Sequence, residues 1–186
     1  MFTDTGQCPQ WVIEDTGWDY GAGFYGFNYK NNTFRLYTES LTTVPEVPYI
    51  DVIVDRTASG TDIERGVNSD LYIVSGRNVE NKNFCITTTM NSPSTVFIYN
   101  LRNRLLKEGI VVEDNIIESC ESETSLLKYK SPVNTDMLRV MMFKSDNMMA
   151  EATLRALAPG QNRDAAIKKE LAFWKSCGVS TDFIKI

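Results

Sequence analysis

The spacing of apolar residues changes along the chain, and this change most constrains the fold. Up to about residue 90, short aromatic or β-branched runs partly alternate with polar positions, a period of two that is typical of strands. Such runs occupy residues 24–29, 33–37, 49–54, 70–75 and 84–88. The turn-forming Lys30-Asn31-Asn32 separates the first two runs, which are therefore expected to form a hairpin. This part of the chain is predicted to be β-rich.

A helical period appears first near residue 94. Ser94 can cap a helix in which Phe97, Leu101 and Leu105 recur every four residues, before Gly109 provides a left-handed stop. A short strand is expected next, at residues 110–112, followed by a polar segment with weak strand signal near residues 116–117.

The final third of the chain has helical periodicity throughout. Helices are expected at about residues 133–143, 147–157 and 163–177, the last two ended by Pro159-Gly160 and Gly178. Asn134 or Thr135 can cap the first of them, which is expected to bury Leu138, Met141 and Met142. The whole pattern predicts an α+β protein: a β-rich region at residues 1–120 with one helix near 94–108, and a helical region at residues 121–186.

Composition excludes several classes of function. The 186 residues include 19 basic and 24 acidic side chains, a net charge of −5 that opposes binding to nucleic acid. The chain has no histidine, which rules out a Ser-His-Asp triad, a Cys-His pair and a histidine-ligated metal within it. No apolar run is long enough to span a membrane, and no export signal is recognised. No metal or cofactor is expected.

Several short motifs have ordinary structural interpretations. The four cysteines, Cys8, Cys85, Cys120 and Cys177, form no Cys-x-x-Cys pair, so free thiols and three complete pairings all stay open. The glycines of residues 21–26 match a dinucleotide-binding pattern, but a strand-like run follows where a helix is required, so they are interpreted as turn or close-packing residues. Ser125 and Lys128 match a Ser-x-x-Lys nucleophile pattern that short sequences often contain by chance.

The strongest candidate site is Ser145-Asp146-Asn147, between two expected helices. A hydroxyl and a carboxamide two residues apart can face one cleft, where serine relays a proton and asparagine holds an amide group of a substrate. The alternative is structural: Asp146 or Asn147 caps the following helix.

Residues 131–157, which surround this tripeptide, closely resemble the segment that carries the second active-site motif of class C low-molecular-mass penicillin-binding proteins, the D-alanyl-D-alanine carboxypeptidases/endopeptidases. Upstream, Pro9-Gln10-Trp11, Asp15 and Tyr20-Gly21-Ala22 are similar to a stretch of the same family that precedes an aromatic strand. The strand near residue 84 and the helix after it resemble the late part of that family's insert.

The resemblance implies a β-rich insert domain followed by a helical, incomplete segment of a penicillin-binding transpeptidase-like domain. It implies that Ser145 passes a proton toward the leaving amine, that Asn147 binds the substrate backbone, and that Asp146 is structural. The complete protein would cleave peptidoglycan stem peptides through an acyl-enzyme, react with β-lactams and work in the periplasm or cell envelope, without a cofactor.

Two family motifs are not found where the resemblance requires them. Ser125 lies only twenty residues before Ser145, which leaves no room for the insert between the first and second motifs, and no Lys-Thr-Gly follows Ser145. The chain is therefore expected to be a fragment that a penicillin cannot acylate by itself. A competing hypothesis is a non-catalytic envelope module that binds peptidoglycan or a protein partner, with Ser145 and Asn147 serving only the helix end.

Overall fold

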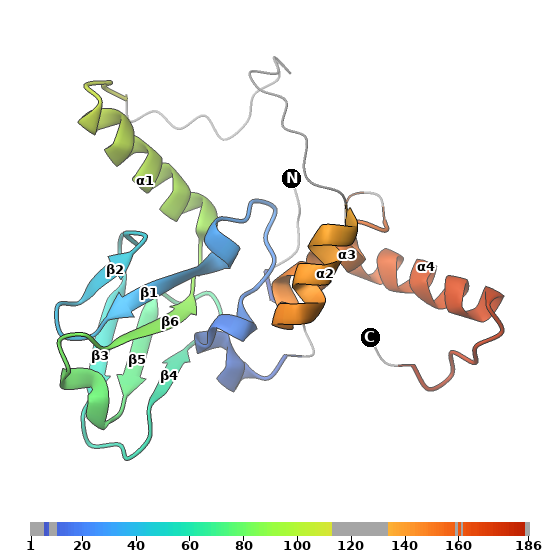
Figure 1. The fold of residues 1–186 in the computed structure, drawn as a ribbon, viewed down its shortest axis with the longest axis horizontal. Helices are drawn as coiled ribbons and strands as arrows, with labels where there is room; N and C mark the ends of the chain where they lie inside the picture. The colour runs from blue at the N-terminus through green and yellow to red at the C-terminus, as the bar shows by residue number, and fades with distance from the viewer. Residues whose placement is uncertain (1–5, 8–10, 113–133, 159, 161, 185–186) are drawn as a thin grey trace.

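The computed structural model describes residues 6–7, 11–112, 134–158, 160 and 162–184. Within these residues, two three-stranded sheets lie in the first part of the chain and three of the four α-helices in the last part (Figure 1). This arrangement confirms the α+β class and the β-rich character of the first part. The expected boundary near residues 120–130, the weak strand signal at residues 116–117 and the Ser125 motif lie outside the described residues.

The first sheet is antiparallel, in the order β2-β1-β6. Its central strand, β1 (Thr33–Tyr37), pairs with β2 (Thr42–Val44) on one side and β6 (Cys85–Thr89) on the other. The second sheet has the order β3-β5-β4, in which β5 (Leu71–Ser75) runs parallel to β3 (Asp51–Asp55) and antiparallel to β4 (Asp62–Arg65). The strands expected at residues 33–37, 49–54, 70–75 and 84–88 are thus confirmed, with small shifts of their ends.

Both sheets contribute to one hydrophobic core. Alternate residues of β1, including Phe34 and Leu36, pack with Tyr72 and Val74 of β5, and all four are almost completely buried. The rings of Phe34 and Tyr72 meet edge to face, with centroids 5.4 Å apart. The hydroxyl of Tyr72 donates a hydrogen bond to the carbonyl of Thr89 (2.8 Å), and burial raises the pKa of Tyr72, so this donor stays protonated.

The other described elements are 3-10 segments and α-helices. The 3-10 segments are η1 (Ile13–Gly17), η2 (Asp19–Gly21), η3 (Lys30–Asn32) and η4 (Arg77–Glu80). The α-helices are α1 (Pro93–Lys107), α2 (Asn134–Lys144), α3 (Asn147–Arg155) and α4 (Arg163–Ser176). All four predicted helices are confirmed, and Gly109 and Gly178 have the left-handed backbone expected after α1 and α4. The expected cap of α1 is wrong: Ser92 is the N-cap residue, and Ser94 lies inside the helix. None of the described helices is both long and apolar enough to cross a membrane.

The predicted hairpin at residues 24–37 is wrong. Residues 24–29 form no strand, because asparagine side chains occupy the backbone groups that a partner strand would need. The Asn28 side chain accepts a hydrogen bond from the Tyr25 amide and donates one to the Tyr25 carbonyl, and Asn32 accepts from the Tyr29 amide. β1 pairs with β2 and β6 instead. Both β2 and β4 were missed, since neither shows an alternating apolar pattern.

Two further expectations, the burial of one face of α2 and a strand at residues 110–112, are also wrong. Leu138 and Met142 of α2 are 37% and 76% exposed, and Met141 is half-buried, because few described residues cover this helix. Leu101 of α1 is 43% exposed, since α1 projects beyond the sheets and buries only its first turns, at Pro93 and Val96 (Figure 1). Residues 110–112 form no strand.

A buried cluster of charges joins α3 to the start of α4. The carboxylate of Glu151 accepts hydrogen bonds from the Nε atoms of Arg155 (2.8 Å) and Arg163 (3.0 Å). The three side chains are at most 10% exposed. Arg155 also lies over the ring of Phe24, 5.7 Å from its centroid, which connects α3 to the N-terminal part of the chain.

The substitution Glu151→Gln is expected to lower the free energy of unfolding by about 3 kcal/mol, because it removes the negative charge that compensates two buried guanidinium groups. Chemical denaturation measures the loss. The matched control is Glu108→Gln, which breaks the exposed Arg104–Glu108 pair and should cost no more than about 0.5 kcal/mol. Equal losses in the two variants would show that the buried cluster is not a stabilising element.

Gly17 is expected to tolerate no side chain. A Cβ atom at this position would collide with the backbone carbonyl of Ile63 in β4, while the Gly17 carbonyl accepts a hydrogen bond from Thr88 Oγ1 (2.6 Å) that holds η1 against β6. Gly17→Ala should therefore reduce stability by about 1–3 kcal/mol. Gly60→Ala is the control, since a Cβ there meets nothing within 4 Å; thermal midpoints that fall equally in both variants would contradict the close packing.

Candidate functional site

The candidate tripeptide forms the turn between α2 and α3. Ser145 has a left-handed backbone (φ 52°), which ends α2 and reverses the chain. Asp146 is the N-cap of α3: its Oδ1 accepts a hydrogen bond from the Met149 amide (2.8 Å). The structural interpretation is therefore confirmed for Asp146 and wrong for Asn147, which is the first residue of the helix.

Ser145 and Asn147 face a common hollow of about 310 Å³. Both side chains are exposed, and both line this hollow, which the N-terminal part of the chain completes. The remaining lining residues are Asp19, Tyr20, Ala22, Asn31, Thr33, Lys144, Asp146 and Met148. The two predicted site residues thus lie together at an open surface.

Asn147 is oriented by the backbone of a distant segment. Its Nδ2 donates a hydrogen bond to the Tyr20 carbonyl (2.9 Å), 127 residues away in sequence. The side-chain oxygen of Asn147 accepts no hydrogen bond from the described residues, and the hydroxyl of Ser145 likewise has no partner among them. Both polar groups are therefore available to a ligand in the hollow.

The surroundings of the hollow are polar and of mixed charge. Lys144 supplies an ammonium group, and Asp19 and Asp146 supply carboxylates. Partial desolvation and the nearby carboxylate of Asp15, which accepts a hydrogen bond from Tyr20 Oη (3.2 Å), raise the pKa of Tyr20. The Tyr20 phenol therefore keeps its proton at physiological pH and donates a hydrogen bond to Asp15.

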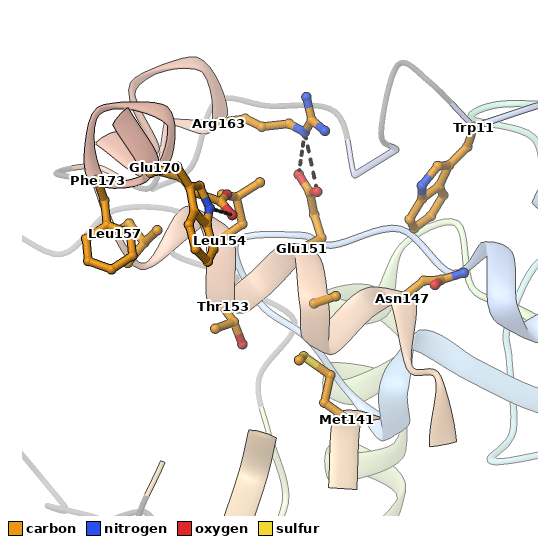
Figure 2. A pocket seen from close by; sticks show the side chains of 12 residues that line it. Trp11, Met141, Asn147, Glu151, Thr153, Leu154, Leu157, Arg163, Glu170 and Phe173 are labelled. Atoms are coloured by element: carbon orange, nitrogen blue, oxygen red, sulfur yellow. Dashed lines mark hydrogen bonds and ion pairs between the residues drawn. The ribbon is translucent and has the colours of Figure 1, made fainter. Parts of the chain in front are cut away.

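A second hollow, of about 590 Å³, extends from Asn147 along α3 toward α4. Figure 2 shows Asn147 at one end, Phe173 and Leu157 at the other, and the Glu151–Arg163 pair between them. Its lining is mainly apolar apart from this pair, Asn147, Glu170 and Thr153. Asn147 borders both hollows, so a ligand held by its amide can extend into either.

The other sequence motifs take no part in this arrangement. A Cβ atom on Gly21 would collide with the Asp15 carbonyl, and one on Gly23 with the Gly6 carbonyl, which confirms close packing of these glycines. Cys85 and Cys177 are free thiols, whereas Cys8 and Cys120 lie outside the described residues. In the part of the chain that the structure describes, no group of three or more Cys, Asp or Glu side chains could hold a metal ion.

Sequence reasoning missed the residues that hold the turn from the other side. Asn31 donates to Asp146, and the backbone of Tyr20 holds Asn147. The Lys30-Asn31-Asn32 run was recognised as a turn, but no local pattern connects it with residues more than 110 positions away.

Comparisons with known proteins place the chain in a family. The model of the D-Ala-D-Ala carboxypeptidase 3 (S13) family matches residues 1–181. No match was found among curated proteins. Among solved structures, the chain is similar to penicillin binding protein 4 of Haemophilus influenzae, with a TM-score of 0.74 and 19% sequence identity. That match covers 100% of this chain and 46% of the other, so the chain spans less than half of that protein, and at this identity the likeness establishes the fold. The family match covers nearly the whole chain, which therefore belongs to the D-Ala-D-Ala carboxypeptidase 3 (S13) family.

Proposed function

We propose that the chain is part of a serine-type D-Ala-D-Ala carboxypeptidase/endopeptidase that cleaves peptidoglycan stem peptides through an acyl-enzyme. Family membership supports the class of reaction. The observation that carries the proposal for this site is the common hollow, toward which Ser145 and Asn147 both present polar groups with free hydrogen-bonding capacity. The chain supplies one wall of the active site.

Each residue of the wall has a separate role. When a nucleophilic hydroxyl attacks the amide carbon of the substrate, the carbon–nitrogen bond breaks and the leaving nitrogen must gain a proton. A neighbouring base takes the proton of the attacking hydroxyl and passes it to Ser145, while Ser145 donates its own hydroxyl proton to the leaving nitrogen and is unchanged at the end of the step. Asn147 holds the substrate backbone through its free side-chain oxygen and its second amide hydrogen.

This wall cannot perform the reaction alone. Acylation requires a nucleophile, a base and an oxyanion site held together, and the second motif supplies none of these three elements. We therefore expect that a penicillin does not acylate residues 1–186. The complete enzyme would act in the periplasm or cell envelope, with stem peptides and β-lactams as its ligands.

The proposal is tested in the longest open reading frame that contains this chain. A fluorescent penicillin should label that protein, and Ser145→Ala should slow labelling by at least about a hundredfold, the usual contribution of proton transfer by a positioned side chain. The rate of labelling is followed on gels, and circular dichroism verifies that the variant is folded.

Ser59→Ala is the matched control, because Ser59 is an exposed serine in the connection between β3 and β4 and does not line the hollow. It should label at the normal rate. A folded reading frame that takes up no penicillin would overturn the enzyme proposal in favour of a non-catalytic envelope module. Normal labelling of Ser145→Ala would remove Ser145 from the mechanism.

A further inference from the structure

The η3 turn opposite Ser145 has an unusual backbone. Lys30, Asn31 and Asn32 have φ angles of 54°, 56° and 55°, so three consecutive residues other than glycine are left-handed. Such residues are disfavoured sterically and persist where the surroundings hold them. Asparagine tolerates this conformation better than most residues, which suits the sequence to the turn.

Asn32 anchors the turn from inside. Its side chain is fully buried and donates from Nδ2 to the Gly23 carbonyl (2.8 Å) and to Asn28 Oδ1 (2.6 Å). Its backbone carbonyl accepts a hydrogen bond from the Met90 amide (2.7 Å), immediately after β6. The turn is therefore fastened to the β-rich part of the chain on two sides.

The same turn reaches across to α3. Asn31 Nδ2 donates to Asp146 Oδ2 (3.3 Å), and Asn32 Nδ2 lies 3.4 Å from Met148 Sδ. The two carboxylate oxygens of Asp146 thus have different partners: Oδ1 caps α3 through the Met149 amide, and Oδ2 receives Asn31. Tyr20 of η2 adds a further contact, because its backbone carbonyl accepts a hydrogen bond from Asn147 Nδ2.

We propose that the η3 turn positions the candidate site, with Asn31 as the positioning residue that fixes Asp146 and thereby the backbone from which Ser145 projects. The hydroxyl of Ser145 has no hydrogen-bond partner among the described residues, so its direction depends on how this backbone is held. Asn31 is hydrogen-bonded to Asp146, and Tyr20 is hydrogen-bonded to Asn147. Both residues that follow Ser145 are therefore bound to the β-rich part of the chain. The catalytic consequence of this arrangement depends on the function proposed above.

The substitution Asn31→Asp isolates the contact. Aspartate has nearly the same shape and also tolerates a left-handed backbone, but it places a second carboxylate opposite Asp146. Hydrogen exchange in the first turn of α3, including the Met149 amide, should become about fivefold faster, as expected for the loss of one hydrogen bond. The measurement uses residues 1–186 and is read by mass spectrometry.

Two further variants distinguish loss of the positioning contact from a general loss of stability. In Asn31→Asp combined with Asp146→Asn, donor and acceptor are exchanged, and asparagine remains a good N-cap, so slow exchange should return. Asn68→Asp is the matched control, because Asn68 is also an exposed asparagine with a φ of 56° but lies in the turn between β4 and β5. It should leave exchange in α3 unchanged.

The effect on function is measured as the rate of penicillin labelling of the protein that the longer reading frame encodes. Asn31→Asp should slow labelling, and the exchanged pair should restore the rate. If Asn31→Asp changes neither hydrogen exchange nor labelling, or if the exchanged pair restores neither, the positioning role is overturned. If exchange responds as expected while Ser145→Ala labels normally, the positioning contact stands and the proposed role of Ser145 fails.

Discussion

Hydrogen bonds between residues 20–32 and the first turn of α3 are the constraint on which the candidate site depends. Tyr20 and Asn31 each hold one residue of the Ser145 turn, and Asn32 lies beside Met148. The Arg155–Phe24 contact adds a further connection between the same two segments. Without these contacts, the turn would be a short connection that joins the largely exposed helix α2 to α3. With them, a serine and an asparagine face one hollow.

The energetic character of these contacts differs from that of the core. The two sheets are held by apolar burial around Phe34, Leu36, Tyr72 and Val74, which has little directionality. The Ser145 turn is instead held by the exposed hydrogen bonds of Tyr20 and Asn31, which are directional and each contribute modestly to stability. Stability and site geometry therefore depend on different interactions, so a change at the η3 turn can disturb the site while the sheets stay folded.

Under the function proposed above, these contacts would position the groups of the active site. A motif on a helix end must present its groups at defined positions, because proton transfer and backbone recognition both weaken steeply with misalignment. In this chain, the groups that hold the motif come from the β-rich part. That part supplies the Tyr20 carbonyl, which accepts a hydrogen bond from Asn147, and the Asn31 amide, which donates one to Asp146.

Local sequence determined the class and most elements of this protein. Apolar periodicity located four strands and all four helices of the described residues, and the absence of histidine excluded whole groups of mechanisms, because periodicity and residue type are properties of short segments. Resemblance around residues 131–157 identified Ser145 and Asn147 as the candidate site. Local sequence did not reveal that asparagine side chains replace a strand at residues 24–29, nor that β1 pairs with β6. Only the tertiary structure decided that Tyr20 and Asn31 meet the Ser145 turn, since contacts across 115 and 127 residues arise from the packing of whole elements and leave no periodic trace in the sequence.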